Sequence, residues 1–230
     1  PHWSFSSLNA LLNICSLQWA FERHWKLPSE GPVSSALVMG SAYHRCLERE
    51  ATARMDGETI KRDELPDLFT DLLDRQIEDD GGEVDWKKSN YEESAEQGRK
   101  LVQCHMDNIN PDERVVAVNH TFCVPLVDSE GNVADRPLIG EADCCVETED
   151  GLTVVDWKTA SSRYSDWKVA KSPQATAMLY GVGRSLGPVD RFRFDIVVKL
   201  KRAPVYETYT TTRSQDDYDR LGALALVAEQ

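Results

Sequence analysis

GLTVVDWKTA, residues 151–160, is the stretch that decides the fold. Its residues 152–155 are apolar or β-branched, which predicts a strand running into a core. Asp156 and Lys158 follow two positions apart and so share one strand face, while Trp157 points to the other. An ion pair at a strand end is one interpretation. The alternative is the site of a metal-dependent phosphodiesterase.

Strand patterns surround this stretch on both sides. Residues 136–160 predict two strands joined by a hairpin, because Asp150-Gly151 provides the positive φ that a tight turn needs. RVVAVNHTFCVPLV, residues 114–127, predicts a strand before them, so the three form an antiparallel meander. Two further strands are expected over 191–200 and 205–212.

Helical signals occupy the remaining segments. Residues 172–186 predict a helix with a serine cap and Pro173 at its first position, and this helix is the crossover that permits a parallel strand pairing afterwards. A last helix begins at Ser214. Helices are also predicted over 6–25, 34–55, 62–78 and 89–108.

This order of elements predicts a mixed α/β (α+β) fold, with a central mixed sheet and a helical N-terminal elaboration. We expect a single domain over 1–230, whose parts are a mostly helical 1–110, a sheet core over 111–212 and a C-terminal helix over 213–230. The acidic segment 78–85 is expected to be a solvated loop.

Composition limits the function. The net charge of −13 argues against a protein that simply coats nucleic acid. Residues 151–230 nevertheless carry 12 Lys and Arg against 9 Asp and Glu, which leaves room for a local basic surface. No apolar run approaches the roughly 20 residues of a membrane span, and no signal segment opens the chain. We therefore expect no membrane contact. We also expect a reducing compartment, first of all the cytoplasm of a bacterium or of a phage-infected cell.

The two candidate carboxylates lie on neighbouring strands. Asp143 precedes Asp156 by thirteen residues, on the other side of the predicted hairpin, so their side chains can meet. Carboxylates suit Mg²⁺ or Mn²⁺, which would lower the pKa of a water, and Lys158 would orient that water. The backbone carbonyl of Trp157 could serve as a neutral ligand. Glu141 shares a strand face with Asp143 and could assist it.

These residues carry a resemblance. GEAD (140–143) followed by VVDWKT (154–159) resembles the paired motif of the PD-(D/E)XK nuclease superfamily, and GSAYHRCLE (40–48) resembles the histidine-bearing helix of its RecB-type branch. That branch includes CRISPR-associated RecB-like exonucleases. Residues 4–25 resemble the opening helix of the branch, so the similarity spans about 4–212. It implies a restriction-endonuclease-like fold, a mixed sheet flanked by helices.

The resemblance also assigns roles. It implies that His44, Asp143, Asp156 and the carbonyl of Trp157 hold metal, and that Lys158 is the catalytic lysine. Gln174 matches the glutamine of the branch's Q-x-x-x-Y helix, which touches DNA or orders the site. Further candidates are the nearby Tyr180 and Glu48, which could support the site, and Lys168 and Lys171, which could contact the substrate. Met178 stands where the branch has its tyrosine, which places any role of Tyr180 in doubt.

An iron–sulfur cluster is common in this branch, built from one cysteine in the first helix and three near the C-terminus. Cys15 occupies the first position, but no cysteine follows Cys145, so we expect no cluster in this chain. The six cysteines instead read as reduced, small apolar residues.

Three functions remain. The leading expectation is a metal-dependent DNA nuclease, an exonuclease acting on single strands or on duplex ends in repair, recombination or phage and CRISPR-type processing, with protein partners in such complexes. The second is a non-cutting nucleic-acid-binding module of nuclease fold in a recombination or integration complex. The third is a hydrolase of other phosphoesters.

Overall fold

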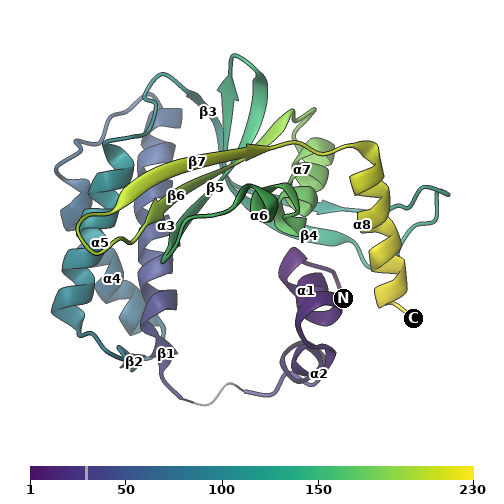
Figure 1. Cartoon of the computed structure of the whole chain (residues 1–230), viewed down its shortest axis with the longest axis horizontal. Helices are drawn as coiled ribbons and strands as arrows, with labels where there is room; N and C mark the ends of the chain where they lie inside the picture. The colour runs from purple at the N-terminus through teal and green to yellow at the C-terminus, as the bar shows by residue number, and fades with distance from the viewer. Residues whose placement is uncertain (29–30) are drawn as a thin grey trace.

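The structure is a computed structural model that describes residues 1–28 and 31–230. Its centre is a five-stranded sheet in the order β3-β4-β5-β6-β7 (Figure 1). The strands are β3 (Arg114–Val124), β4 (Leu138–Thr148), β5 (Gly151–Ala160), β6 (Arg191–Val198) and β7 (Val205–Thr211). The predicted meander is confirmed, because β3, β4 and β5 pair antiparallel, whereas β5 and β6 pair parallel and β6 and β7 antiparallel.

Local chemistry explains the two connections on either side of β5. Gly151 follows the β4–β5 turn with φ +101°, a backbone conformation that side-chain-bearing residues rarely adopt. After β5 the chain returns through α6 (Asp166–Ala170) and α7 (Pro173–Ser185), which supply the length that a parallel pairing requires. The Ser172 hydroxyl accepts from the backbone N–H of Ala175 at 3.3 Å and so caps α7, as predicted.

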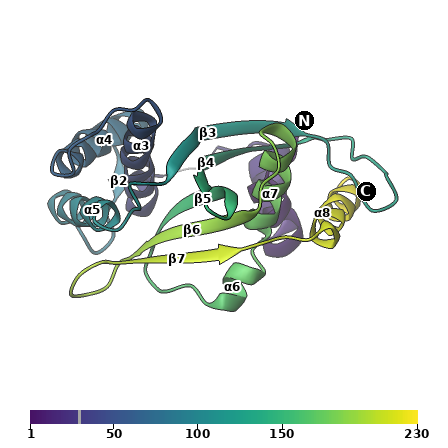
Figure 2. The ribbon, with the colours of Figure 1, turned by 90° about the horizontal axis from the view of Figure 1, so that it is seen from above.

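Helices cover both faces of the sheet (Figure 2). One face packs against α3 (Ser35–Met55), α4 (Leu65–Asp79) and α5 (Tyr91–Met106), and the other against α7, α8 (Gln215–Ala228) and α1 (Phe5–Asn9). The two apolar cores separate along β5, since Val154 belongs to the α7 side and Trp157 to the α3 side. β5 therefore contributes side chains to both cores, as β3, β4 and β6 also do.

The predicted single helix over 6–25 is wrong. The structure has α1, a wide turn η1 (Ala10–Ile14), then α2 (Ser16–Trp19) and a second wide turn η2 (Ala20–His24). Cys15 between them is extended, with φ −160° and ψ 112°. The break lets Trp19 Nε1 donate to Ser7 Oγ at 2.8 Å. A continuous helix would hold these two residues about 18 Å apart along its axis, at about 1.5 Å per residue.

The acidic segment before α5 is also less irregular than predicted. Its last two residues form the short strand β2 (Val84–Asp85), which pairs parallel with β1 (Val33–Ser34). Across the part of the chain that the structure describes, no helix combines the length and apolarity that crossing a membrane requires.

Candidate active site

The site forms where the β4–β5 ladder ends. Cys144 and Val155 are the last paired residues, and Asp143 and Asp156 are the next residue on each strand. The two side chains do not pair with each other. Asp143 Oδ2 accepts the backbone N–H of Trp157 at 2.8 Å, and Asp156 is 5% exposed. The end of the ladder thus places two carboxylates side by side at one point of the sheet.

Lys158 forms an ion pair with Asp156, as the spacing predicts. Its Nζ lies 2.9 Å from Asp156 Oδ1 and 2.7 Å from Oδ2, and the Oδ2 contact lacks hydrogen-bond geometry. Burial raises the pKa of Asp156 to about 6, although the charge of Lys158 opposes the shift. Burial lowers the pKa of Lys158, but the charges of Asp156 and Asp143 outweigh it and the net shift is upward. A buried ion pair of this kind costs desolvation energy and is weak evidence for stability alone.

His44 reaches the site from α3. Its Nδ1 lies 3.5 Å from Asp143 Oδ2, and its ring meets Trp157 edge to face at 6.3 Å. Burial lowers the pKa of His44, yet the hydrogen bond and charge of Asp143 raise it above its ordinary value. The pKa of Asp143 is lowered in turn, because His44 and Lys158 together outweigh the effect of burial. Ring and carboxylate stabilise each other's charged forms.

Gln174 enters from the opposite side of the sheet. It is the second residue of α7, and its Nε2 donates to Asp156 Oδ1 at 2.6 Å. Arg213 braces this turn, since its Nη2 donates to the Ser172 carbonyl at 2.8 Å and its Nε to Thr176 Oγ1 at 2.7 Å. The residues on either side of Gln174 are thereby hydrogen-bonded to the segment that precedes α8.

The donor set fits a hard divalent cation in its chemistry. It offers two carboxylates and an imidazole, and Asp156 Oδ2 is buried without a hydrogen-bond donor among the described residues. The N–H and C=O of a strand residue point to the same neighbour, so the Trp157 carbonyl faces the gap beyond the ladder, as its N–H does. Within residues 1–28 and 31–230, however, no group of three or more His, Cys, Asp or Glu side chains is already gathered at metal-binding distances.

The other predicted residues lie in different places. Lys168 on α6 is exposed, with Nζ 3.4 Å from the centre of the Tyr164 ring. Lys171 lines a pocket between α7 and α8. Glu48 is half-buried one turn beyond His44, and both line a shallow groove along α3. The structure thus brings Glu48 near His44, although no hydrogen bond or ion pair joins them among the described residues.

Two candidates form no hydrogen bond or ion pair with the cluster among the described residues. Glu141 is exposed and pairs across the ladder with Thr121 on β3. Tyr180 is buried on α7, and its hydroxyl donates to the Pro125 carbonyl at 2.7 Å and accepts from Val127 N–H at 3.2 Å. Both hydrogen bonds of that hydroxyl go to the loop after β3, and Tyr180 lies six residues beyond Gln174 on α7.

Sequence reasoning missed a polar network behind the site, on the α3 side of the sheet. Arg193 makes paired hydrogen bonds to Glu113 at 2.6 and 2.9 Å and to Asp195 at 2.8 and 3.1 Å. Tyr43, the neighbour of His44, shares a 2.9 Å hydrogen bond with His105 Nδ1 of α5. The alternation of Arg193 and Asp195 along β6 was the available signal, since the residues between and beside them, Phe192, Phe194 and Ile196, are apolar and form the opposite face.

Comparison with known proteins agrees with this arrangement. The family model of the PD-(D/E)XK nuclease superfamily matches residues 2–226. The chain is similar to a crystal structure from Eubacterium rectale, of a protein named as a candidate exonuclease, with a TM-score of 0.57 at 12% identity. The match covers 98% of this chain and 77% of the Eubacterium rectale chain. The structure of SSO0001 has a TM-score of 0.34 at 12% identity, and the match covers 92% of this chain and 83% of the SSO0001 chain. No curated protein matches.

The expected fold is confirmed by these findings, since a mixed five-stranded sheet flanked by helices is the restriction-endonuclease-like arrangement. The match covers nearly all of the chain, including both acidic motifs and the histidine helix. The chain belongs to the PD-(D/E)XK nuclease superfamily.

Proposed function

We propose that this nuclease is a metal-dependent deoxyribonuclease that acts as an exonuclease. The observation that carries the proposal is the convergence of Asp143, Asp156 and Lys158 at the end of the β4–β5 ladder, with His44 from one layer of helices and Gln174 from the other. The superfamily generally uses divalent metals. Such a cation neutralises charge developing on the phosphate and lowers the pKa of a bound water.

Each residue has a separate role in this proposal. His44, Asp143, Asp156 and the Trp157 carbonyl hold Mg²⁺ or Mn²⁺, which prefer oxygen ligands and, for Mn²⁺, accept imidazole. Lys158 positions the attacking water or the scissile phosphate. Gln174 keeps Asp156 Oδ1 occupied, and so fixes the rotation of that carboxylate. Glu48, one turn after His44 on α3 and lining the same groove, is proposed to assist it.

DNA as the substrate, and cutting from an end, are further parts of the proposal. The name of the similar Eubacterium rectale protein and the resemblance to RecB-type exonucleases support them. Lys168 and Lys171, both exposed around α6, are proposed to contact the strand. The setting proposed is repair, recombination, or phage or CRISPR-type DNA processing, in a single domain over 1–230 that works with protein partners.

End-labelled single-stranded DNA, double-stranded DNA and RNA, each with Mg²⁺, Mn²⁺ or EDTA, test this function. We expect metal-dependent loss of DNA from one end, seen as mononucleotides or short products before full-length strands are nicked. Lys158→Ala is the matched control for contaminating nucleases. Binding of DNA without cleavage under every metal condition would contradict the proposal and favour the non-cutting module.

A further inference from the structure

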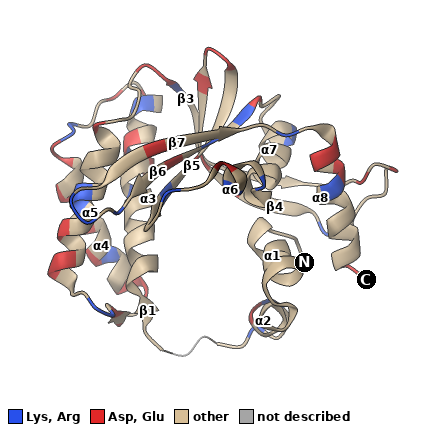
Figure 3. Ribbon diagram, viewed as in Figure 1, with Lys and Arg blue, Asp and Glu red and all other residues tan. Residues whose placement is uncertain are grey.

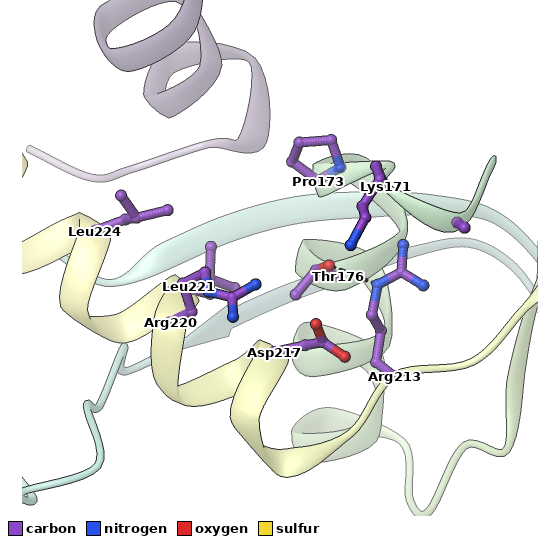
Figure 4. Close-up of a pocket in the computed structure, with 9 residues that line it drawn as sticks. Lys171, Pro173, Thr176, Arg213, Asp217, Arg220, Leu221 and Leu224 are labelled. Carbon is purple, nitrogen blue, oxygen red and sulfur yellow. Dashed lines mark hydrogen bonds between the residues drawn. The ribbon is translucent and has the colours of Figure 1, made fainter. Parts of the chain in front are cut away.

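A pocket lies between the start of α7 and α8 (Figure 4). Lys171, Arg213 and Arg220 form its polar wall, and Pro173, Leu221 and Leu224 its apolar wall. In Figure 4 the head groups of the three cations point into the space between the two helices. They come from three separate segments, which the fold gathers at one place.

These cations are not neutralised by close carboxylates. Within residues 1–28 and 31–230, neither Lys171 nor Arg213 nor Arg220 lies within 4.0 Å of a carboxylate oxygen. Arg213 donates only to neutral oxygens, two backbone carbonyls and two threonine hydroxyls. The net charge of the chain is −13, so three such cations in one pocket form a local positive region that can attract an anion.

One acid lines the pocket as well. Asp217 Oδ2 accepts from the Ser214 backbone N–H at 2.9 Å and from its hydroxyl at 3.1 Å, so this oxygen closes the capping box of α8. Its charge offsets one of the three cations and leaves the wall with an excess of two. Figure 3 shows both blue (Lys or Arg) and red (Asp or Glu) positions in the first turns of α8.

The size and lining of the pocket indicate that it holds only part of a longer ligand. The cavity volume is about 160 Å³, below the roughly 300 Å³ at which pockets begin to enclose whole small molecules. Leu221 is buried and Leu224 is 42% exposed, so the apolar wall continues outward to the surface. A phosphate against the cations, with its sugar against Pro173 and Leu224, satisfies both walls.

The pocket and the active site share the first turn of α7. Lys171 and Pro173 line the pocket, and Gln174, the next residue, contacts Asp156. Arg213 links the two, because it lines the pocket and also holds the Ser172 carbonyl and Thr176 Oγ1 on either side of Gln174. The pocket and Asp156 are thus connected through neighbouring residues at the start of α7, and a strand that passes this end of the helix runs from one to the other.

We propose that this pocket binds a phosphate group of the nucleic-acid strand while the strand is held at the active site. The inference rests on the proposed function, because it takes a nucleic acid as the ligand. The phosphate is either an internal phosphodiester or a terminal phosphomonoester. Both present anionic oxygens for which Lys and Arg are suited.

Binding in EDTA, where no strand is cut, tests the pocket. We would titrate short fluorescein-labelled DNA single strands bearing a 5′-phosphate, a 3′-phosphate or neither, with Kd measured by anisotropy at several KCl concentrations. The test variant is Lys171→Gln/Arg220→Gln, whose side chains are both exposed, so folding should persist and is checked by thermal melting. Lys201→Gln/Arg202→Gln, in the turn between β6 and β7, removes the same two charges from an exposed site outside the pocket.

The test variant should bind about tenfold more weakly at low salt, with a salt slope smaller by about one, while the control pair stays within about twofold of wild type. If wild type binds a 5′- or 3′-phosphorylated strand more tightly than the unphosphorylated strand, and the test variant does not, the pocket binds a terminal phosphate. If the test variant binds all three strands more weakly by the same factor, the pocket binds an internal phosphate. Equal affinity of wild type and test variant, in a protein that still cuts DNA with Mn²⁺, overturns the pocket and the proposed strand contact of Lys171, and leaves the nuclease function standing. A wild-type protein that neither binds nor cuts DNA removes the proposed function and the pocket together.

Discussion

Gln174 Nε2 and Asp156 Oδ1 lie 2.6 Å apart, and this hydrogen bond joins the first turn of α7 to the middle of β5, where its ladder with β4 ends. Lys158 Nζ reaches the same oxygen at 2.9 Å. The carboxylate is therefore held by a neutral donor on one side and a cation on the other, while its Oδ2 has no hydrogen-bond donor among the described residues. Under the proposed function, that oxygen, 2.7 Å from Lys158 Nζ, is the one that a metal would contact.

Gln174→Ala should lower the cleavage rate about tenfold or more while metal stays bound. The amide is expected to orient Asp156 without being a ligand, so its loss lets the carboxylate rotate. Single-turnover rates and calorimetric Mn²⁺ titrations of the variant separate the two effects, and Gln174→Asn is the matched variant that keeps an amide on a shorter side chain. A Gln174→Ala variant that cuts at the wild-type rate would exclude this role.

Removing Arg193 should destabilise the fold. This side chain is 18% exposed and pairs with Glu113 at 14% and Asp195 at 3%. Arg193→Met would leave two carboxylates unpaired in a buried place, so we expect a loss of about 3–5 kcal/mol in the free energy of unfolding. Urea titrations measure it, with exposed Arg202→Met as the control. A loss no larger than that of the control would show that the network contributes nothing to stability.

His105 should make stability depend on pH. It is buried among Tyr43 of α3, Tyr206 of β7 and the charges of Arg193 and Arg54, and burial lowers its pKa to about 3. The unfolded state, with a pKa near 6.5, binds the proton first, so stability is lost as the pH falls below about 6.5. Between pH 7 and 5 this contribution amounts to about 2 kcal/mol at most.

His105→Gln keeps a partner for the Tyr43 hydroxyl and removes the titration. Urea denaturation of both proteins at pH 7 and pH 5 gives the comparison, in which other titrating groups cancel. Wild type should lose more stability on acidification than the variant does. Identical losses would mean that His105 is protonated as easily in the folded as in the unfolded protein.

Local patterns predicted the sheet well because their signals are local. The period-two alternation and the Gly151 turn set the β4–β5 hairpin, and the caps of α7 and α8 lie within three residues of the groups they satisfy. The break at Cys15 could not be predicted in this way. It depends on Trp19 returning to Ser7, twelve residues back, where helical propensity carries no information.

The candidate site also divides into residues that local patterns could predict and residues that they could not. Strand alternation and the hairpin predicted that Asp143, Asp156 and Lys158 would meet, whereas His44 and Gln174 were placed only through the resemblance to a family. Their helices lie on opposite faces of the sheet, and no local rule joins them to β5. Arg213 had no sequence signal at all, because its partners Ser172 and Thr176 are 41 and 37 residues away.

The central claim is that Asp156 is a metal ligand and Lys158 is not, although the two form one ion pair. Calorimetric Mn²⁺ titrations beside single-turnover DNA cleavage, for Lys158→Ala and Asp156→Asn, test it most directly. Lys158→Ala should bind Mn²⁺ at least as tightly as wild type, since a neighbouring positive charge has gone, yet lose at least about 10²-fold in rate. Asp156→Asn should lose both metal affinity and rate, because an amide is a weaker, uncharged ligand. Near wild-type cleavage by Lys158→Ala with Mn²⁺ would reduce the pair to a strand-end ion pair and contradict the account.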